Sequence, residues 1–148
     1  MSDKNLLLEL ADRCEAEEPS RELDCRIWAA TNDRAFRVHE GEMQVKDVTG
    51  WFTVGWIDGK HSYTHECSFV TKATTSLDAA VTLVPERLSW EVRRSGFGNP
   101  SQADIGDPMQ SPPNSMARVS INRGVPAALA LCAAALRARA ASEGQKDG

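Results

Sequence analysis

Residues 74–94, TTSLDAAVTLVPERLSWEVRR, carry the clearest structural pattern in this chain. Apolar residues recur at helical spacing from Leu77 to Val84, and Thr75 with Asp78 fits a capping box at the start of that helix. Pro85 ends the helix, because a residue before proline is pushed out of the helical region. The run LSWEVRR at 88–94 then alternates apolar and polar side chains. The stretch predicts a short amphipathic helix, a turn and a half-buried strand.

The chain on the C-terminal side predicts a long loop, a second strand and an alanine-rich helix. Residues 95–116 are rich in Gly, Pro, Ser, Asn and Asp, which predicts a long flexible loop. The alternation resumes at 117–122, and we expect this strand to pair antiparallel with 88–94, so that Glu91 faces Arg118. Pro126 then opens a helix through residue 140, because proline is favoured at the first helical position. Residues 142–148 have the composition of a disordered tail.

The chain on the N-terminal side predicts two helices and then strands. Helical spacing of apolar residues predicts helices at 3–18 and 20–30, the second capped by Ser20, although LDCRIWAAT taken alone also suits a strand. Short strands are expected at 36–38 and 44–48. Both faces of 51–57 are apolar, which indicates a strand covered on both sides. Asp58 and Gly59 suit a tight hairpin turn, with a returning strand at 61–70.

These elements predict an α+β fold in a single domain, residues 1–148. We expect one mostly antiparallel sheet of about four strands, made from 51–57, 61–70, 88–94 and 117–122. The N-terminal, central and C-terminal helices would pack on this sheet, because each has one apolar stripe to bury. If helices cover both faces, the result is an α-β-α sandwich.

Three blocks of the sequence resemble the phage ABA sandwich domain, a family of small phage and prophage proteins. The blocks are SRELDCRIW at 20–28, YTHECSFVTKATTSLDAAVTLVP at 63–85 and ARVSINRGVPAALALCAAALRARA at 117–140. Together they cover a little over a third of the chain. The resemblance implies a phage origin and helices on both faces of a sheet. It implies no catalytic residue, because the matching positions are helix caps and core positions.

Charge and composition exclude some classes of function. The net charge of −4 lacks the positive footprint of a general nucleic-acid binder, so we do not expect nucleic acid as a partner. The four cysteines include no CxxC pair, and we expect them to be reduced. No apolar run is long enough for a signal peptide or a membrane span. These features favour a cytoplasmic protein, in the bacterial host cell if the resemblance holds, with no cofactor.

His61, His65 and Cys67 form the cluster best suited to a metal. Imidazole and thiolate groups are ligands that zinc prefers, and on a strand all three side chains share one face. A fourth ligand is not visible in the sequence. The alternative interpretation is an ordinary sheet face with satisfied histidines.

A second candidate site is an arginine cluster. Arg93, Arg94, Arg118 and Arg123 converge if strands 88–94 and 117–122 pair, and their guanidinium groups could bind a phosphate. Of the four tryptophans, Trp56 is the one we assign to the same ligand as a stacking surface. The alternative is a solvated polar face with cross-strand ion pairs, and tryptophans in the core.

Three functions therefore remain open. The first is a non-enzymatic phage accessory protein that acts as a binding module for a host or phage protein. The second is the sequestration of a small anionic ligand, such as a nucleotide signal, against host defence. The third is a metal-dependent enzyme that uses His61, His65 and Cys67. A homo-oligomer is compatible with each.

Overall fold

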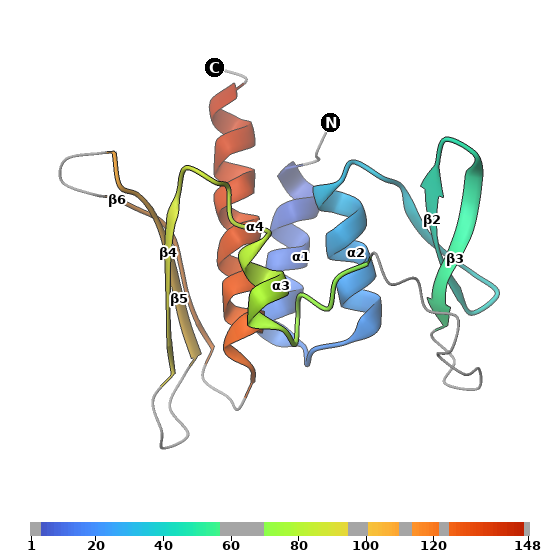
Figure 1. The fold of residues 1–148 in the computed structure, drawn as a ribbon, viewed down its shortest axis with the longest axis horizontal. Helices are drawn as coiled ribbons and strands as arrows, with labels where there is room; N and C mark the ends of the chain where they lie inside the picture. Colours follow the sequence, from blue (N-terminus) through green and yellow to red (C-terminus); the bar gives the residue numbers. More distant parts are fainter. Residues whose placement is uncertain (1–3, 57–69, 95–100, 110–113, 122–124, 147–148) are drawn as a thin grey trace.

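The structure, a computed structural model, describes residues 4–56, 70–94, 101–109, 114–121 and 125–146. In this part of the chain the helices form a central layer, and a three-stranded antiparallel sheet lies on each side of it (Figure 1). The α+β class is as predicted. The prediction of a single sheet of about four strands is wrong, since the described strands form two separate sheets.

The described residues contain four helices and six strands. In chain order they are α1 (Lys4–Ala16), α2 (Arg21–Thr31), β1 (Phe36–His39), β2 (Glu42–Asp47), β3 (Gly50–Trp56), α3 (Leu77–Val81), β4 (Ser89–Arg94), β5 (Ser101–Asp107), β6 (Asn114–Ile121) and α4 (Ala127–Lys146). The two N-terminal helices are confirmed, and Ser20 caps α2 by accepting the Leu23 N–H at 3.1 Å. The predicted turn at Asp58 and Gly59 and nearly all of the predicted strand 61–70 lie outside the described residues.

Ion pairs hold the helices of the central layer together. Arg13 of α1 donates to Glu17 one turn later at 2.7 Å and to Glu22 of α2 at 2.9 Å. Arg137 of α4 donates to Asp12 of α1 at 2.7 Å and also to Glu15. Both arginines are about one-quarter exposed, at 26% and 30%. They link helices whose apolar faces supply most of the packing.

The sheet β1-β2-β3 packs one face against α2. β2 pairs antiparallel with both neighbours, and its register with β3 shifts between Met43 and Gln44. A small core lies between this sheet and the helix: Cys25, Ala29, Met43, Val45, Val54 and Val70. On β3, Val54 and Gly55 are buried and the other residues are half-buried, and the cover on both faces stays a prediction.

The sheet β4-β5-β6 corrects the predicted strand pairing. β5 lies inside the segment that was predicted to be a loop, and it pairs antiparallel with β4 on one side and β6 on the other. The direct pairing of 88–94 with 117–122 is therefore wrong. β5 alternates as a strand should, with Ser101, Ala103 and Ile105 buried. Two of those buried side chains are small, which is why the alternation is weak in the sequence.

Helix α3 is short, with 5 residues. Its N-cap is Ser76 rather than the predicted Thr75: the Ser76 hydroxyl accepts the Ala79 N–H at 3.3 Å from an extended backbone. After α3, the N–H of Leu88 donates to the carbonyl of Pro85 at 2.9 Å and turns the chain into β4. The helix, turn and strand predicted for 74–94 are therefore present in the predicted order, although the helix ends at Val81 rather than near Val84.

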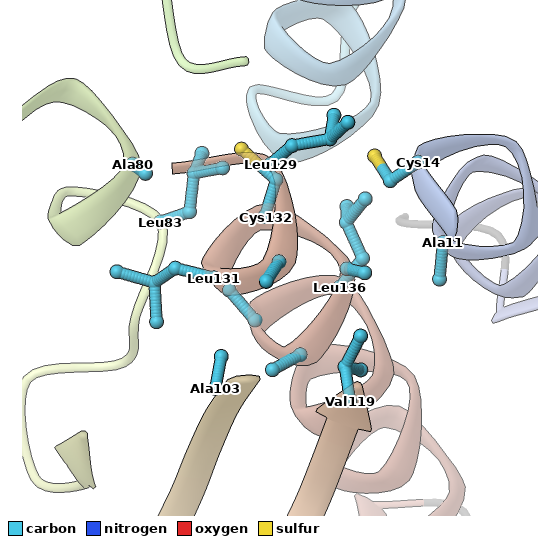
Figure 2. Close-up of a cluster of buried hydrophobic side chains, with 14 of the residues drawn as sticks. Ala11, Cys14, Ala80, Leu83, Ala103, Val119, Leu129, Leu131, Cys132 and Leu136 are labelled. Carbon is cyan, nitrogen blue, oxygen red and sulfur yellow. The ribbon is translucent and has the colours of Figure 1, made fainter. Parts of the chain in front are cut away.

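Helix α4 is enclosed by the rest of the described structure. From Ala128 to Leu136 no residue is more than 2% exposed. The sheet β4-β5-β6 contacts one side of α4, and α1 and α3 contact the others; Figure 2 shows side chains from all of these elements around Leu131 and Cys132. The alanines allow this, because small side chains let neighbours approach closely on every side. The helix continues past Ser142 to Lys146, so the predicted tail begins too early.

Residues 70–74 are hydrogen-bonded to two helices, to α2 through Arg21 and Asp24 and to α4 through Cys132. The Asp24 Oδ1 atom accepts the backbone N–H of Thr74 at 2.9 Å and its hydroxyl at 2.7 Å. Arg21 donates to Asp24 at 3.4 Å and to the Val70 carbonyl at 2.7 Å. Asp24 is only 3% exposed. Two residues of the RELD motif therefore act as a clamp on this segment, which leads from the small core into α3.

The order of layers differs from an α-β-α sandwich. In Figure 1 the sheets lie outside and the helices lie between them. The reason is α4. A helix that is apolar on every side must pack against other elements on every side, so it lies inside, whereas each sheet has one polar face that can be exposed to solvent.

Candidate functional site

The exposed face of the sheet β4-β5-β6 contains a depression of about 240 Å³. It is lined by residues from each strand: Glu91 and Arg93 of β4, Gln102, Ala103 and Asp104 of β5, and Arg118 of β6. The opposite face of the same sheet packs against α4. The depression therefore lies on the outer surface of the molecule.

The strand register places the charged side chains in rows across the sheet. Glu91 is opposite Asp104, which is opposite Arg118, and Arg93 is opposite Gln102 in the next row. Arg118 Nη2 donates to Asp104 Oδ2 at 3.0 Å, and Arg93 Nε donates to Glu91 Oε1 at 2.6 Å. The predicted contact between Glu91 and Arg118 is wrong, because β5 separates them.

The charges that line the depression balance. Two carboxylates accompany two guanidinium groups, and both arginine side chains are 74% exposed. Exposed ion pairs of this kind add little to stability, because water screens them. They leave N–H donors and carboxylate oxygens at the surface, where a ligand that carries both signs of charge could bind.

The backbone beneath the depression is held firmly. Ile105 of β5 and Val119 of β6 are at most 2% exposed and belong to the main core with α4. The buried hydroxyl of Ser101 donates to the Val125 carbonyl at 3.0 Å, which ties β5 to the segment that precedes α4. A rigid strand scaffold keeps the exposed side chains in fixed rows, which favours specific binding.

The structure brings together two of the four residues assigned to a ligand site. Arg93 and Arg118 both line the depression, although the direct strand pairing from which their convergence was predicted is wrong. Trp56 does not join them, because it lies in β3 opposite Glu42, in the sheet on the other side of the helices (Figure 1). Arg123 and the side chain of Arg94 lie outside the described residues.

Sequence reasoning missed Gln102 and Asp104. Both are on β5, in the segment SQADIGD at 101–107, where polar residues alternate with Ser, Ala and Ile. This alternation of polar and small or apolar residues, with a period of two, was the sequence signal for a strand. The glycines and prolines around it, together with the small size of the buried residues, favoured a loop instead.

The outer face of the other sheet carries a connected set of polar side chains. Arg37 stacks over the Trp51 ring, 4.1 Å from its centroid, and donates to Gln44 at 2.8 Å. Gln44 in turn donates to Glu42 at 2.8 Å, and the Thr53 hydroxyl lies 3.4 Å from the same carboxylate. These groups satisfy one another, so a ligand here would have to displace existing hydrogen bonds.

The predicted metal ligands, His61, His65 and Cys67, lie outside the described residues. Within the ranges that the structure describes, no group of three or more His, Cys, Asp or Glu side chains is arranged to hold a metal ion. In the same ranges, no helix is long and apolar enough to cross a membrane.

The described cysteines are core residues. Cys14, Cys25 and Cys132 are buried and form no disulfide with one another. The Cys132 thiol donates to the Ala73 carbonyl at 3.1 Å, so α4 also holds the segment that Asp24 clamps. Burial raises the pKa of Cys14 to about 12 and that of Cys132 well above its ordinary value. Such thiols are poor nucleophiles and poor metal ligands.

The raised thiol pKa predicts that stability falls in alkali. In the unfolded chain the Cys14 thiol loses its proton near its ordinary pKa of 9.0, whereas in the folded protein burial raises that pKa to about 12. Above pH 9 the free energy of unfolding should therefore fall by up to about 1.4 kcal/mol per pH unit for each such thiol. Urea denaturation at pH 8, 9 and 10 measures this slope. Cys14→Ala should have a shallower slope, and equal slopes would contradict the prediction.

Comparison with known protein families found no matching family, and no curated protein or solved structure matched the chain either.

Proposed function

We propose that this chain is a non-enzymatic accessory protein of a phage or prophage, and that it binds a phage or host protein through the exposed face of β4-β5-β6. The observation that carries the proposal is the depression with balanced charges on a rigid sheet. The three sequence blocks that resemble a phage family support the phage origin.

A protein partner suits this surface better than a small anion. The guanidinium group of Arg118 already bonds to Asp104 at 3.0 Å, and that of Arg93 bonds to Glu91 at 2.6 Å. A phosphate bound to the remaining N–H groups of these arginines would lie beside both carboxylates, which costs electrostatic energy. A protein surface carries both signs of charge and can pair with both an arginine and a carboxylate, such as Arg118 and Asp104.

The described residues that line the depression also argue for binding rather than catalysis. Their exposed groups are two carboxylates, two guanidinium groups and one amide, while the Ala103 side chain is buried on the α4 side of the sheet. The lining contains no hydroxyl, thiol or amine nucleophile, and each of its two carboxylates, which could act in their place, is bonded to an arginine. The metal-dependent enzyme remains the alternative that depends on His61, His65 and Cys67.

Charge reversal at Arg118 tests the proposal. The experiment uses three tagged proteins: the wild type, Arg118→Glu and the control Arg34→Glu. Each captures proteins from lysates of a bacterium, uninfected and phage-infected, and quantitative mass spectrometry identifies what is bound. Arg34 is exposed and lies shortly after α2, next to the other sheet. We expect the same protein to be enriched by the wild type and by Arg34→Glu, and to be reduced at least tenfold with Arg118→Glu, because interface arginines often dominate binding.

Two results would contradict this assignment. Equal capture by all three proteins would show that the depression is not the binding surface. A rise in melting temperature of the wild type with mono-, di- or cyclic nucleotides, absent in Arg118→Glu, would instead establish the small anionic ligand. Circular dichroism of each variant confirms that the fold is intact.

A further inference from the structure

We propose that β4 is a homodimerisation edge, through which two copies of this chain join their sheets antiparallel about a two-fold axis at Val92. The inference goes beyond the proposed function, because it concerns the assembly of the chain and holds or fails whatever partner the depression binds. Its basis is the pattern of charge along β4 together with the position of that strand in the sheet.

β4 is an edge strand of its sheet. The strand order is β4-β5-β6, and among the described helices and strands β4 contacts only β5 and α4. Its second side therefore presents backbone N–H and C=O groups that no other described element covers. β4 also carries Trp90, which is 41% exposed although its register partner, Ile105, is fully buried. An edge strand with an exposed aromatic residue is a template for another strand.

The charges of β4 are complementary to those of a second β4. In an antiparallel pair with Val92 on the axis, Glu91 lies opposite Arg93 of the partner subunit, and the symmetry repeats the contact. Two ion pairs of opposite charge result, on the face that carries the depression. On the other face, Trp90 lies diagonal to Val92 of the partner subunit, within reach of an aromatic side chain.

Neighbouring registers lack this complementarity. With the axis at residue 91, two glutamates lie directly opposite one another, and with the axis at residue 93, two arginines do. Like charges opposite one another in a sheet are destabilising. A shift by one residue in the pairing would turn the polar face of one β4 to the same side of the sheet as the apolar face of the other. Charges usually protect an edge from pairing, but here they select one register.

The dimer would have a continuous six-stranded sheet. A two-fold axis perpendicular to the sheet keeps both depressions on one face and both α4 helices on the other. In the single chain Glu91 and Arg93 bond to each other within one strand, with side chains 58% and 74% exposed. In the dimer the same two groups would exchange partners across the axis, so that both keep a partner of opposite charge.

Charge-swap variants test the pairing. Sedimentation equilibrium over a range of concentrations should show a wild-type dimer. Glu91→Arg and Arg93→Glu should each raise the dimer dissociation constant about tenfold or more, because each places like charges opposite one another twice. A mixture of these two variants should form a heterodimer, because every facing pair then has opposite charges. The double variant Glu91→Arg/Arg93→Glu should dimerise like the wild type.

The control is Glu9→Arg, an exposed charge reversal on α1, which should leave the dissociation constant unchanged. Arg118→Glu should also dimerise, which separates this test from that of the proposed function. A wild type that stays monomeric at every concentration would overturn the proposal. So would a dimer that both single swaps leave intact, or a pair of swaps that fails to form the heterodimer.

Discussion

Asp24→Ala is expected to lower the free energy of unfolding by about 3–5 kcal/mol, the cost of removing one member of a buried charged pair. The Asp24 carboxylate is 3% exposed and accepts both the N–H and the hydroxyl of Thr74, while Arg21 donates to its other oxygen. Alanine would leave the buried Thr74 N–H without its acceptor and the Thr74 hydroxyl with only the Ser20 carbonyl, at 3.4 Å. Urea denaturation followed by circular dichroism measures the change.

Two milder substitutions at the same site separate the contributions. Thr74→Val removes the hydroxyl and keeps the N–H bond, so it should cost about 1–2 kcal/mol. Asp24→Asn keeps one oxygen acceptor for Thr74 and should cost less than Asp24→Ala. The double variant Asp24→Ala/Thr74→Val should cost less than the sum of the two single changes, because both remove one interaction. A loss below about 1 kcal/mol for Asp24→Ala would show that the clamp is dispensable.

Leu131→Ala is expected to destabilise the fold by about 2–5 kcal/mol, because it leaves a cavity in the centre of the main core. Leu131 is 0% exposed and lies on the enclosed helix α4, among Leu83, Ala103 and other core residues (Figure 2). Many of its neighbours on α4 are alanines, which have no side-chain rotamers and cannot move to fill the space. The cost should therefore lie in the upper half of the range.

Leu77→Ala provides the matched control. Leu77 is 37% exposed at the start of α3, so the same truncation removes little buried surface. We expect a loss below about 1 kcal/mol. Thermal and urea denaturation of both variants give the comparison directly. Equal losses at Leu77 and Leu131 would contradict the central position of α4 in the core.

Local patterns in the sequence predicted the helices well. The stripe of Leu6, Leu10 and Cys14 with Leu7 and Ala11 beside it, the cap at Ser20 and the alanine run of α4 each involve residues within a few positions of one another. Of that stripe, Leu6 is the one residue that is exposed rather than buried. The Ser76 cap was misplaced by one position, because Thr75 and Ser76 carry the same hydroxyl chemistry. Helix caps are short-range features, so errors of this size are expected.

The pairing of strands and the order of the layers could not be predicted in the same way. β5 buries Ser101 and Ala103, whose small side chains give little hydrophobic signal, yet they fit beneath an alanine-rich helix. Whether β3 shares a sheet with β4 depends on contacts across the whole chain. The clamp between Asp24 and Thr74 joins residues 50 positions apart, and only the fold brings them together.

The candidate site was predicted only in part, because it too depends on how the strands pair. Alternation placed Arg93 and Arg118 on polar strand faces, and they do line one depression. Their partners changed once β5 lay between the strands, since Asp104 now pairs with Arg118. The sequence predicted an arginine cluster suited to an anion. The structure instead has a surface of balanced charge, because β5 places the Asp104 carboxylate beside Arg118.

The enclosed position of α4 also constrains the time course of folding during synthesis. This helix is the last described element to leave the ribosome, yet α1, α3 and the sheet β4-β5-β6 all bury their apolar residues against it. Those earlier elements keep apolar surface exposed until residues 127–136 emerge, so the main core forms only after α4 is synthesised rather than progressively along the chain.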